Sequence, residues 1–346
     1  MSFYEIALPP SRGPSSSGDI LRLLQAMRPQ PSAAPLVRIG PGGDGTYLLP
    51  DDLKGITACF SPGVDNFKNF EDVLANRYGI AAHMCDGLGS ADELRTPLIP
   101  GKQTFEKLWL DINGAEGTVS LDDWVSRHSP DPAEDLILQM DIEGAEYRNL
   151  LGCSDEVLKR FRIIVLEVHT LMEMKNDTVL AEVLLPFFER LNQHFTCVHL
   201  HPNNVLAPFD IDELGITVPH ILELTYLRND RFEGKDLHKV ELPNPADIEY
   251  NVPNQPPAFM DDFFRGRPPS ASENLRMLND KFDWHYRETG EMIGEGFENV
   301  SQRLARLDVV TAERDAAFVE NHALKKKLGR TFRNRLRKLI GKKPRY

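Results

Sequence analysis

The stretch "LILQMDIEGAEYRNLL", residues 136–151, begins with the pattern of a buried strand and ends with that of a helix. Apolar residues dominate from Leu136 to Met140, and from Tyr147 they recur with helical spacing. Between the two segments stand one glycine and three acids, which are Asp141, Glu143 and Glu146. A strand that turns directly into a helix is the repeating unit of α/β folds, so this stretch predicts that class.

The same alternation continues on both sides of this stretch. Amphipathic helical patterns separate seven apolar runs that we interpret as strands, at 56–61, 80–85, 105–110, 136–142, 162–169, 195–201 and 221–227. Apolar strands that alternate with helices form parallel sheets covered on both faces. The sequence therefore predicts a Rossmann-like, mostly parallel seven-stranded sheet with helices on both faces, followed by a helical C-terminal extension.

Composition divides the chain of 346 residues into four predicted parts. Residues 1–35 hold a short helix between Pro- and Ser-rich flanks, and residues 36–232 form the α/β domain. Residues 233–270 are rich in proline and predict a linker or a strap over the core. Residues 271–346 are helical in pattern. Within them, 297–321 is our candidate for self-association through a short coiled coil, although three clean heptads are lacking.

Charge is distributed unevenly along the chain. Eleven of the 40 Lys and Arg residues, and none of the 52 Asp and Glu residues, lie in 321–346. An acidic body with a basic tail indicates that the tail has its own partner. In residues 324–346 apolar residues recur every three or four positions between basic flanks, which favours a helix lying on an anionic membrane surface. The alternatives are non-specific binding of nucleic acid and docking on the acidic body; we expect no specific nucleic-acid partner.

The location that we expect is cytoplasmic, with the tail peripheral on the inner face of the membrane. No apolar run approaches the length of a membrane-spanning helix. The N-terminus "MSFYEIALPPSRGPSSSG" lacks the apolar region of a secretory signal. The four cysteines are far apart and form no CxxC pair, which fits a reducing compartment.

The residues that follow the strands predict where a ligand binds, because ligands of open α/β sheets lie at the carboxyl ends of the strands. Gly63 follows the first strand in "SPGVDN", and Asp86 follows the second in "CDG". A glycine turn lets the backbone approach a cofactor, and an acid at the next strand end binds ribose hydroxyls. There is no G-x-G-x-x-G motif, which argues against a dinucleotide. Alternatively, Gly63 is only a turn glycine and Asp86 only a helix cap.

Polar side chains recur at the other strand ends. Period-two alternation places Glu167 and His169 on one face of their strand, and His199 and His201 on one face of theirs. Asn203, Asn204, Glu223 and Thr225 add to the set. Such a recurrence is typical of a cleft across the edge of a sheet.

Several segments resemble those of the FkbM-type methyltransferases. The segment "LQMDIEGAEY" resembles the family's K-[IV]-D-[VI]-E-G-A-E motif, and "TVSLDDWV" resembles the segment before it. The glycine turn and second strand "CFSPGVDNFKNFEDVLANRYGIAAHMCD", and the closing strands "VHLHPNN" and "ILELTYLRND", are similar to those of a divergent branch. The resemblance spans about residues 36–230. The chain departs from it in the first motif, D-[VI]-G-A-N-x-G in many members, where Ser61 replaces the first acid and the second glycine is missing.

The resemblance implies an S-adenosylmethionine-dependent O-methyltransferase that acts on a sugar or glycan hydroxyl near a membrane surface. It implies that the cofactor is bound by Gly63, Asp65, Glu71, Asp86 and Asp141. Two alternatives remain. One is a catalytically inactive Rossmann-like platform that scaffolds a membrane-associated glycan-synthesis complex. The other is a nicotinamide-dependent oxidoreductase, which the missing phosphate loop disfavours.

Methyl transfer to an alkyl hydroxyl requires a base or a metal to take the proton. His169 is our first candidate for the base and His201 the second, while Asp141 stands where cofactor and acceptor would meet. Asp141 and Glu167 together would suit magnesium, but paired acids also occur without a metal, so we assign no metal ligand. The glycine-rich segment "RIGPGGDGTYLLPDD" either folds Arg38, Asp44 and Tyr47 over the acceptor or forms a hairpin at the sheet edge.

Overall fold

The computed structural model describes residues 10–265, except 249, 254 and 256–259. The chain divides into two compact units, residues 1–267 and 268–346. The predicted helical extension, with its coiled-coil candidate 297–321 and its basic tail 324–346, lies outside the described residues. In the described part, no helix is both long enough and apolar enough to cross a membrane.

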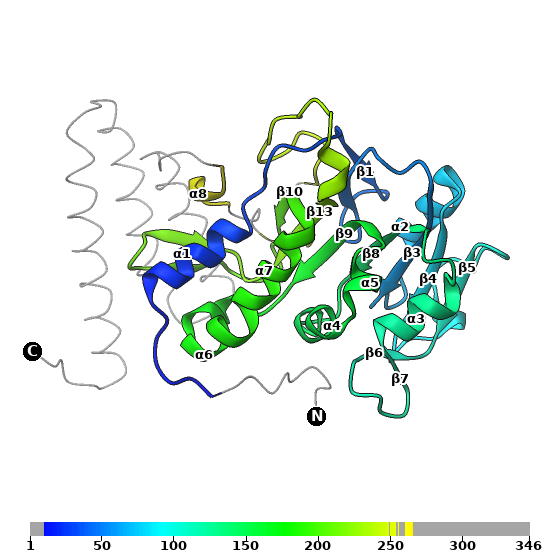
Figure 1. The fold of residues 1–346 in the computed structure, drawn as a ribbon, viewed down its shortest axis with the longest axis horizontal. Helices are drawn as coiled ribbons and strands as arrows, with labels where there is room; N and C mark the ends of the chain where they lie inside the picture. Colours follow the sequence, from blue (N-terminus) through cyan, green and yellow to red (C-terminus); the bar gives the residue numbers. More distant parts are fainter. Residues whose placement is uncertain (1–9, 249, 254, 256–259, 266–346) are drawn as a thin grey trace, which may run out of the picture. The chain divides into compact units, whose positions relative to one another are not determined.

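A seven-stranded sheet forms the centre of the first unit (Figure 1). Its strands lie in the order β10-β13-β9-β8-β3-β4-β5. Four pairings, from β9 to β5, are parallel, and β13 runs antiparallel to both of its neighbours. The strands are β3 (Ile56–Pro62), β4 (Ala81–Cys85), β5 (Gln103–Glu106), β8 (Asp135–Met140), β9 (Phe161–Val168), β10 (Phe195–Pro202) and β13 (Leu222–Arg228).

This strand order confirms the predicted fold class. The first strand of the sheet along the chain is β3, and β4 and β5 follow on one side of it. The chain then crosses back to β8, which lies on the other side of β3. The space between β3 and β8 is therefore the topological switch point, where ligands of doubly wound sheets bind. The parallel strands follow the order of a dinucleotide-binding fold, but the antiparallel β13 between β9 and β10 sets this sheet apart.

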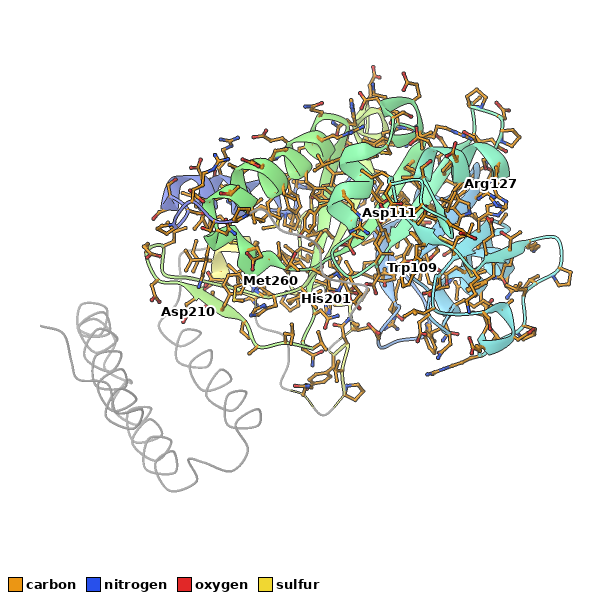
Figure 2. The ribbon with its side chains drawn as sticks, turned by 90° about the horizontal axis from the view of Figure 1, so that it is seen from below. Trp109, Asp111, Arg127, His201, Asp210 and Met260 are labelled. Carbon is orange, nitrogen blue, oxygen red and sulfur yellow. The ribbon has the colours of Figure 1, made fainter. Side chains whose placement is uncertain are left out.

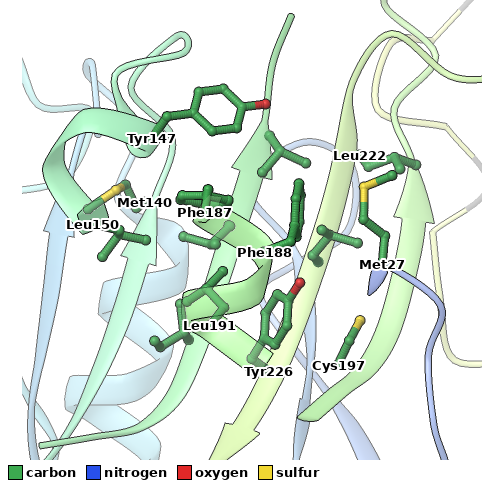
Figure 3. Packing of buried hydrophobic residues seen from close by; sticks show 14 of the residues in the cluster. Met27, Met140, Tyr147, Leu150, Phe187, Phe188, Leu191, Cys197, Leu222 and Tyr226 are labelled. Atoms are coloured by element: carbon green, nitrogen blue, oxygen red, sulfur yellow. The ribbon is translucent and has the colours of Figure 1, made fainter. Parts of the chain in front are cut away.

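Helices pack on one face of the sheet. Inward residues Leu138, Ile164 and Leu166 alternate along β8 and β9 and join one hydrophobic cluster with these helices. In Figure 3, Tyr147 and Phe187 of this cluster lie against each other, with ring centroids 4.8 Å apart. The helices that contribute to the cluster are α1 (Ser17–Ala26), α3 (Leu121–His128), α4 (Glu146–Gly152), α5 (Asp155–Leu158), α6 (Asp177–Val179) and α7 (Leu185–His194).

The opposite face is covered by a hairpin and one helix. Strands β1 (Leu36–Ile39) and β2 (Tyr47–Pro50) pair antiparallel, and α2 (Asn69–Val73) continues into a π-helical turn, Leu74–Tyr78. These elements share a second cluster with Ile137, Ile163 and Val165 of the sheet. The hydroxyl of Thr225 donates to the carbonyl of Leu48 at 2.8 Å. The glycine-rich segment thus forms a hairpin, but the hairpin packs on the sheet face rather than at the sheet edge.

Two predicted elements are interrupted in the structure. The run 105–110 is not one strand: β5 ends at Glu106, and β6 (Trp109–Leu110) pairs instead with β7 (Thr118–Val119). A tight turn separates them, in which the Leu108 amide donates to the Glu106 carbonyl at 2.9 Å. The helical pattern 147–161 is also broken, because Ser154 caps a new helix, α5, by accepting from the Val157 amide.

The proline-rich segment is tied to the sheet domain along its described residues. Ser32 and His238 exchange backbone hydrogen bonds of 3.0 and 2.8 Å, and the Thr217 amide donates to Asp261 at 3.0 Å. We call residues 244–252 the strap. The remaining short elements are β11 (Phe209–Ile211), β12 (Ile216–Val218), α8 (Asp262–Arg265), the 3-10 turns Ala91–Glu93, Leu171–Lys175 and Asn229–Phe232, and the π-helical turn Leu180–Leu184.

Candidate active site

Gly63 brings two strand ends together at the switch point. It follows β3 with φ +86°, and a Cβ atom there would stand 1.8 Å from the carbonyl oxygen of Asp141. Neither the backbone angle nor the contact tolerates a side chain. The first turn after β3 is therefore in direct contact with the first residue after β8.

Strained backbone is concentrated at this edge of the sheet. Among the described residues, three that are not glycine have positive φ: Asp65 at 45°, Glu143 at 57° and Thr170 at 57°. They lie in the connections that follow β3, β8 and β9, which are adjacent strands around the switch point. Non-glycine residues in this region cost free energy, and such strain clusters at functional sites.

Asp86 connects two loops after the strands. One of its carboxylate oxygens accepts from the amides of Leu88 and Gly89, at 2.8 and 2.9 Å, and the other accepts from the Asp65 amide at 3.0 Å. A carboxylate has about four acceptor positions, so about one remains for another donor. Trp109 closes the neighbouring side, since a Cβ on Gly87 would meet its ring at 2.0 Å.

A buried chain of polar groups lies beneath the glycine turn. The Ser61 hydroxyl contacts both Glu71 and Gln139, and the Gln139 amide donates to the Tyr47 hydroxyl at 3.2 Å. Ser61 has one proton for two acceptors, so Glu71 is satisfied best when it carries a proton itself. Burial accordingly raises the pKa of Glu71 to about 7, against the hydrogen bond from Ser61.

Four ionisable residues form a row across four strands. The register pairs Glu167 of β9 with Glu223 of β13, and Glu223 with His201 of β10. Met140 pairs with Leu166, so Asp141 follows at the level of Glu167. Because residues opposite each other in a sheet share a face, these side chains lie on the side of the β1–β2 hairpin. Figure 2 labels His201 at one end of this edge and Trp109 toward the other.

His169 stands among carboxylates just beyond β9. Its Nε2 lies 3.8 Å from Asp141, 3.7 Å from Glu167 and 3.5 Å from Glu143. Its Nδ1 lies 3.1 Å from the Glu167 carbonyl and 3.4 Å from the buried Glu146 carboxylate. The Tyr147 hydroxyl donates to the His169 carbonyl at 2.6 Å and so fixes the backbone.

The ionisable groups of this cluster shift one another's pKa values. Burial alone lowers the pKa of His169, but the hydrogen bond and charge of Glu146, with Asp141 and Glu143, raise it to about 9. Burial, followed by the charge of Asp141, raises the pKa of Glu167 well above its usual value. Burial also raises the pKa of Glu223 and of Asp141.

The strap holds His201 from both sides. His201 Nδ1 lies 3.1 Å from Asp247, and its Nε2 lies 3.0 Å from the Asn251 side-chain oxygen. His199 contacts the same Asp247 oxygen at 3.0 Å. The Asn251 amide also donates to Glu223. Burial lowers the pKa of His201, but Asp247 and Glu223 outweigh it and raise that pKa to about 9.

Two neighbouring asparagines divide their roles. The Asn203 side chain donates to Glu167 at 3.0 Å, which places it in the ionisable row. Asn204 instead binds the strap, because its side-chain oxygen accepts from the amides of Asn251 and Val252 at 3.0 and 2.9 Å. The strap therefore contributes side chains to the candidate site.

The structure brings most of the predicted site residues to one edge. Gly63, Asp65, Asp86 and Asp141 surround the switch point, and His169 and His201 lie further along. Glu71 is buried below the glycine turn, bonded to Ser61, rather than open at the edge. In the hairpin, Tyr47 reaches Gln139 and Asp44 lies with Glu167 and Glu223, whereas Arg38 is exposed.

Sequence reasoning named Glu167 and Glu223 among the polar residues near strand ends without giving them a catalytic or cofactor-binding role, and it missed Asp247 and Asn251. Glu167 was detectable as a partner of His169 by alternation. Glu223 lies near the start of β13. Because β13 runs antiparallel to β9, this start lies at the same edge of the sheet as the carboxyl ends of the parallel strands. Asp247 and Asn251 lie in a proline-rich segment with no periodic signal.

The residues at the switch point fit a nucleoside cofactor. Gly63 leaves backbone exposed where a side chain is sterically excluded, and Asp86 keeps an acceptor position beside it. A glycine turn followed by an acid at the next strand end suits a ribose-bearing ligand. The sheet order and this edge define a Rossmann-like domain whose switch point is suited to a nucleoside-bearing cofactor.

One segment of the chain is similar to a known family. Residues 117–196 match the family model described as "Methyltransferase FkbM domain". The matched segment runs from β7 to the start of β10 and contains Asp141, Glu167 and His169. The chain is therefore similar to this methyltransferase family over residues 117–196, which are less than half of its length. No curated protein matches the chain.

Solved structures resemble the chain only distantly. The METTL16 MTase domain has 11% identity and a TM-score of 0.30, with 51% of this chain and 61% of that chain covered. TrmK of M. capricolum, in complex with S-adenosyl-homocysteine, has 12% identity and a TM-score of 0.30, covering 75% and 93%. The plantazolicin methyltransferase BpumL, also with that product, has 10% identity and a TM-score of 0.25, covering 50% and 76%. The chain spans less than two thirds of the METTL16 domain, and no site or substrate is transferred from these structures.

Proposed function

We propose that this methyltransferase transfers the methyl group of S-adenosylmethionine to a hydroxyl of a sugar or glycan. One observation carries the proposal. The glycine turn and Asp86 lie on one side of Asp141, and the ionisable row lies on the other. Asp141 thus separates a place for the cofactor from a place for a polar acceptor.

The reaction needs alignment and a destination for one proton. The bond between the cofactor sulfur and its methyl carbon breaks as a bond from the acceptor oxygen to that carbon forms, and the hydroxyl proton leaves. Holding the two reactants in line supplies most of the acceleration. The proton passes to the cluster of Asp141, Glu167 and His169, which stands directly beside the switch point.

The two histidines have different surroundings. His169 Nε2 faces the cluster, whereas both nitrogens of His201 are held by the strap. We therefore place His169 in the proton-accepting cluster and give His201 a positioning role on the acceptor side. That His169 is the first candidate for the base and His201 the second stays a prediction.

The sugar acceptor and the membrane context rest on the sequence. A row of carboxylates and histidines offers hydrogen-bond partners to a polyhydroxylated molecule. The basic tail would bring the enzyme to an anionic membrane where lipid-linked glycans are found. The rival function is an inactive platform, which would bind neither cofactor nor acceptor at this edge.

Methyl transfer can be measured directly. The full chain is incubated with S-adenosylmethionine labelled in its methyl group and with membrane-extracted glycan precursors, and the labelled product is identified. We expect label in an O-methyl sugar. Calorimetric binding of the cofactor without transfer to any hydroxyl acceptor would contradict the acceptor class, and absence of cofactor binding would favour the platform.

His169→Ala tests the cluster. We expect turnover to fall at least a hundredfold while cofactor affinity stays within twofold, because the imidazole lies on the acceptor side of Asp141. His194→Ala is the control, since His194 pairs with Asp155 outside the site. Wild-type turnover of His169→Ala at saturating acceptor would remove His169 from the mechanism.

A further inference from the structure

Among the residues that the structure describes, no lysine or arginine forms an ion pair with the cluster of Asp141, Glu167 and His169 beside the switch point. Glu167 is 6% exposed, and Asp141 keeps 30% of its side chain exposed. Among the described residues, the ion pairs of both carboxylates involve His169 alone. Buried carboxylates are normally paired, protonated or bound to a metal. The cluster therefore has an affinity for positive charge that the described side chains satisfy only in part.

The spacing of these atoms matches the surroundings of a metal ion. One ligand atom from each of Asp141, Glu167 and His169 lies within 4.8 Å of the others. His169 Nε2 is 3.8 Å from Asp141 and 3.7 Å from Glu167, too far for a direct hydrogen bond. Ligands at about 2.1 Å from one cation stand about 3.0–3.6 Å apart, so a shift of a few tenths of an ångström would suffice.

His169 supplies a second observation, because its Nε2 faces the cluster and lies 3.5 to 3.8 Å from the carboxylates of Glu143, Glu167 and Asp141. The side chain is 9% exposed, and among the described residues Nε2 has no hydrogen-bond partner. The opposite nitrogen, Nδ1, is oriented by the Glu167 carbonyl at 3.1 Å and the fully buried Glu146 carboxylate at 3.4 Å. Metal-binding histidines have this arrangement, in which a carbonyl or carboxylate holds the nitrogen that does not bind.

We propose that Asp141, Glu167 and His169 bind one divalent transition-metal cation at the acceptor side of the site. Two carboxylates with one imidazole favour a cation of the manganese type over magnesium, which prefers oxygen alone. Three protein ligands leave positions for the acceptor hydroxyl, which the cation would orient and activate, and a carboxylate oxygen of Asp141 or Glu167 that does not bind the cation would take the hydroxyl proton. This role in the reaction rests on the proposed function, but the binding itself does not.

A neighbouring group of acids carries no such inference. Asp44, Glu167 and Glu223 also lie close together, but they are all carboxylates. The Asn251 amide donates to both Glu223 and Asp44, and so takes up part of their hydrogen-bonding capacity. We therefore place one cation on the side of His169.

The probe is Mn²⁺, added to the full chain after treatment with a chelator. Calorimetry and electron paramagnetic resonance measure its binding without cofactor or acceptor, so the result does not depend on methyl transfer. We expect one site in the wild type, and at least tenfold weaker binding in Glu167→Gln and Asp141→Asn. A nitrogen coupling to the bound Mn²⁺ should be present in the wild type and lost in His169→Gln.

Glu106→Gln is the matched control, because Glu106 also contacts a histidine, His128, at the carboxyl end of a strand outside the cluster. Its Mn²⁺ affinity should equal that of the wild type. Circular dichroism establishes whether each variant is folded. If Glu167→Gln does not fold, the Mn²⁺ affinity of Asp141→Asn tests the proposal instead. Absence of the site in the wild type, or equal binding in the cluster variants, would overturn the proposal. Cofactor affinity measured on the same samples shows separately whether the proposed function holds.

Discussion

Asp86 has a structural role and keeps an acceptor position that a ligand could use. Its carboxylate already accepts three backbone amides from the two loops that follow β3 and β4. From the sequence, Asp86 was either a helix cap or a ligand of the ribose. In the structure Asp86 joins two loops through its hydrogen bonds, and about one acceptor position of its carboxylate remains unused. Its loss should therefore affect both the order of the loops and the affinity for the cofactor.

Asp86→Ala should weaken S-adenosylmethionine binding by about 1.5–3 kcal/mol, the usual cost of removing a hydrogen bond to a charged group. Calorimetry on the folded variant measures the change. Asp92→Ala, an exposed acid in the same connection, should leave the affinity unchanged. Equal affinities of Asp86→Ala and the wild type for the cofactor would show that Asp86 only joins the two loops and does not bind the cofactor.

Glu71 predicts a dependence of stability on pH. Its pKa is raised from 4.5 to about 7 in the folded protein, mainly by burial. A carboxyl with a raised pKa holds its proton more tightly when folded, so its stabilising contribution is complete below pH 4.5 and is lost as pH rises through 7. Across that window the loss is about 3 kcal/mol.

Glu71→Gln should remove this dependence, because the amide cannot ionise. Chemical unfolding at pH 5 and pH 8 measures it, and the variant should gain stability relative to the wild type at pH 8. Glu156→Gln, at an exposed position of α5, is the control. A parallel pH profile for Glu71→Gln and the wild type would mean that Glu71 is ionised in the folded protein.

At the scale of elements, the β1–β2 hairpin and the strap complete a site that the sheet begins. The hairpin brings Asp44 and Tyr47 to the sheet face, and the strap brings Asp247 and Asn251 to β10 and β13. Both are irregular segments, which carry functional residues more readily than the elements they connect. A proline-rich segment is suited to this task because little of its conformational freedom remains to be lost.

Asp247→Ala should loosen the strap. Removing one partner of a buried ion pair leaves His199 and His201 without their carboxylate, which costs about 3 kcal/mol of stability. Proteolytic cleavage between residues 233 and 248 should become faster, and the KM for the acceptor should rise while cofactor affinity is kept. Asp236→Ala, an exposed acid in the same segment, should change neither. Unchanged proteolysis of Asp247→Ala would show that other contacts hold the strap.

At the scale of the whole molecule, the separation of charge indicates a second binding function. Residues 321–346 contain eleven basic residues and no acid, whereas all 52 acids lie in the preceding part of the sequence. Attraction of about 1 kcal/mol for each basic residue near an anionic surface makes such a segment a sufficient peripheral anchor. We propose that the tail brings the catalytic domain to its acceptor at the membrane.

Vesicle co-sedimentation tests the anchor. The full chain should pellet with anionic vesicles at low salt and be released at high salt, because the attraction is screened. A chain that ends at Glu320 should stay in solution. Neutral vesicles are the control for apolar binding alone. Equal pelleting of the two chains, or no pelleting of either, would contradict the anchor.

The sequence alone was sufficient to predict the fold class, and it selected candidate ligand-binding residues that lie at one edge of the sheet. Both follow from local patterns, because the apolar runs and their periods reflect burial on two faces, and acids after strands mark the carboxyl ends. Hence Gly63, Asp86, Asp141 and His169 could be chosen from the sequence. The segment 136–151 carried both signals at once, as a buried strand followed by acids.

Only the tertiary structure decided which of these residues touch and what charges they carry. The row from Asp141 through Glu167 and Glu223 to His201 depends on strand order and on the reversed direction of β13, which are long-range properties. The pKa of His169 depends on three carboxylates of residues 141–146, which lie in the connection after a neighbouring strand. Asp247 reaches His201 from 46 residues away along the chain. Contacts of this kind leave no local period in a sequence, because burial and charge are set by the packing of distant segments.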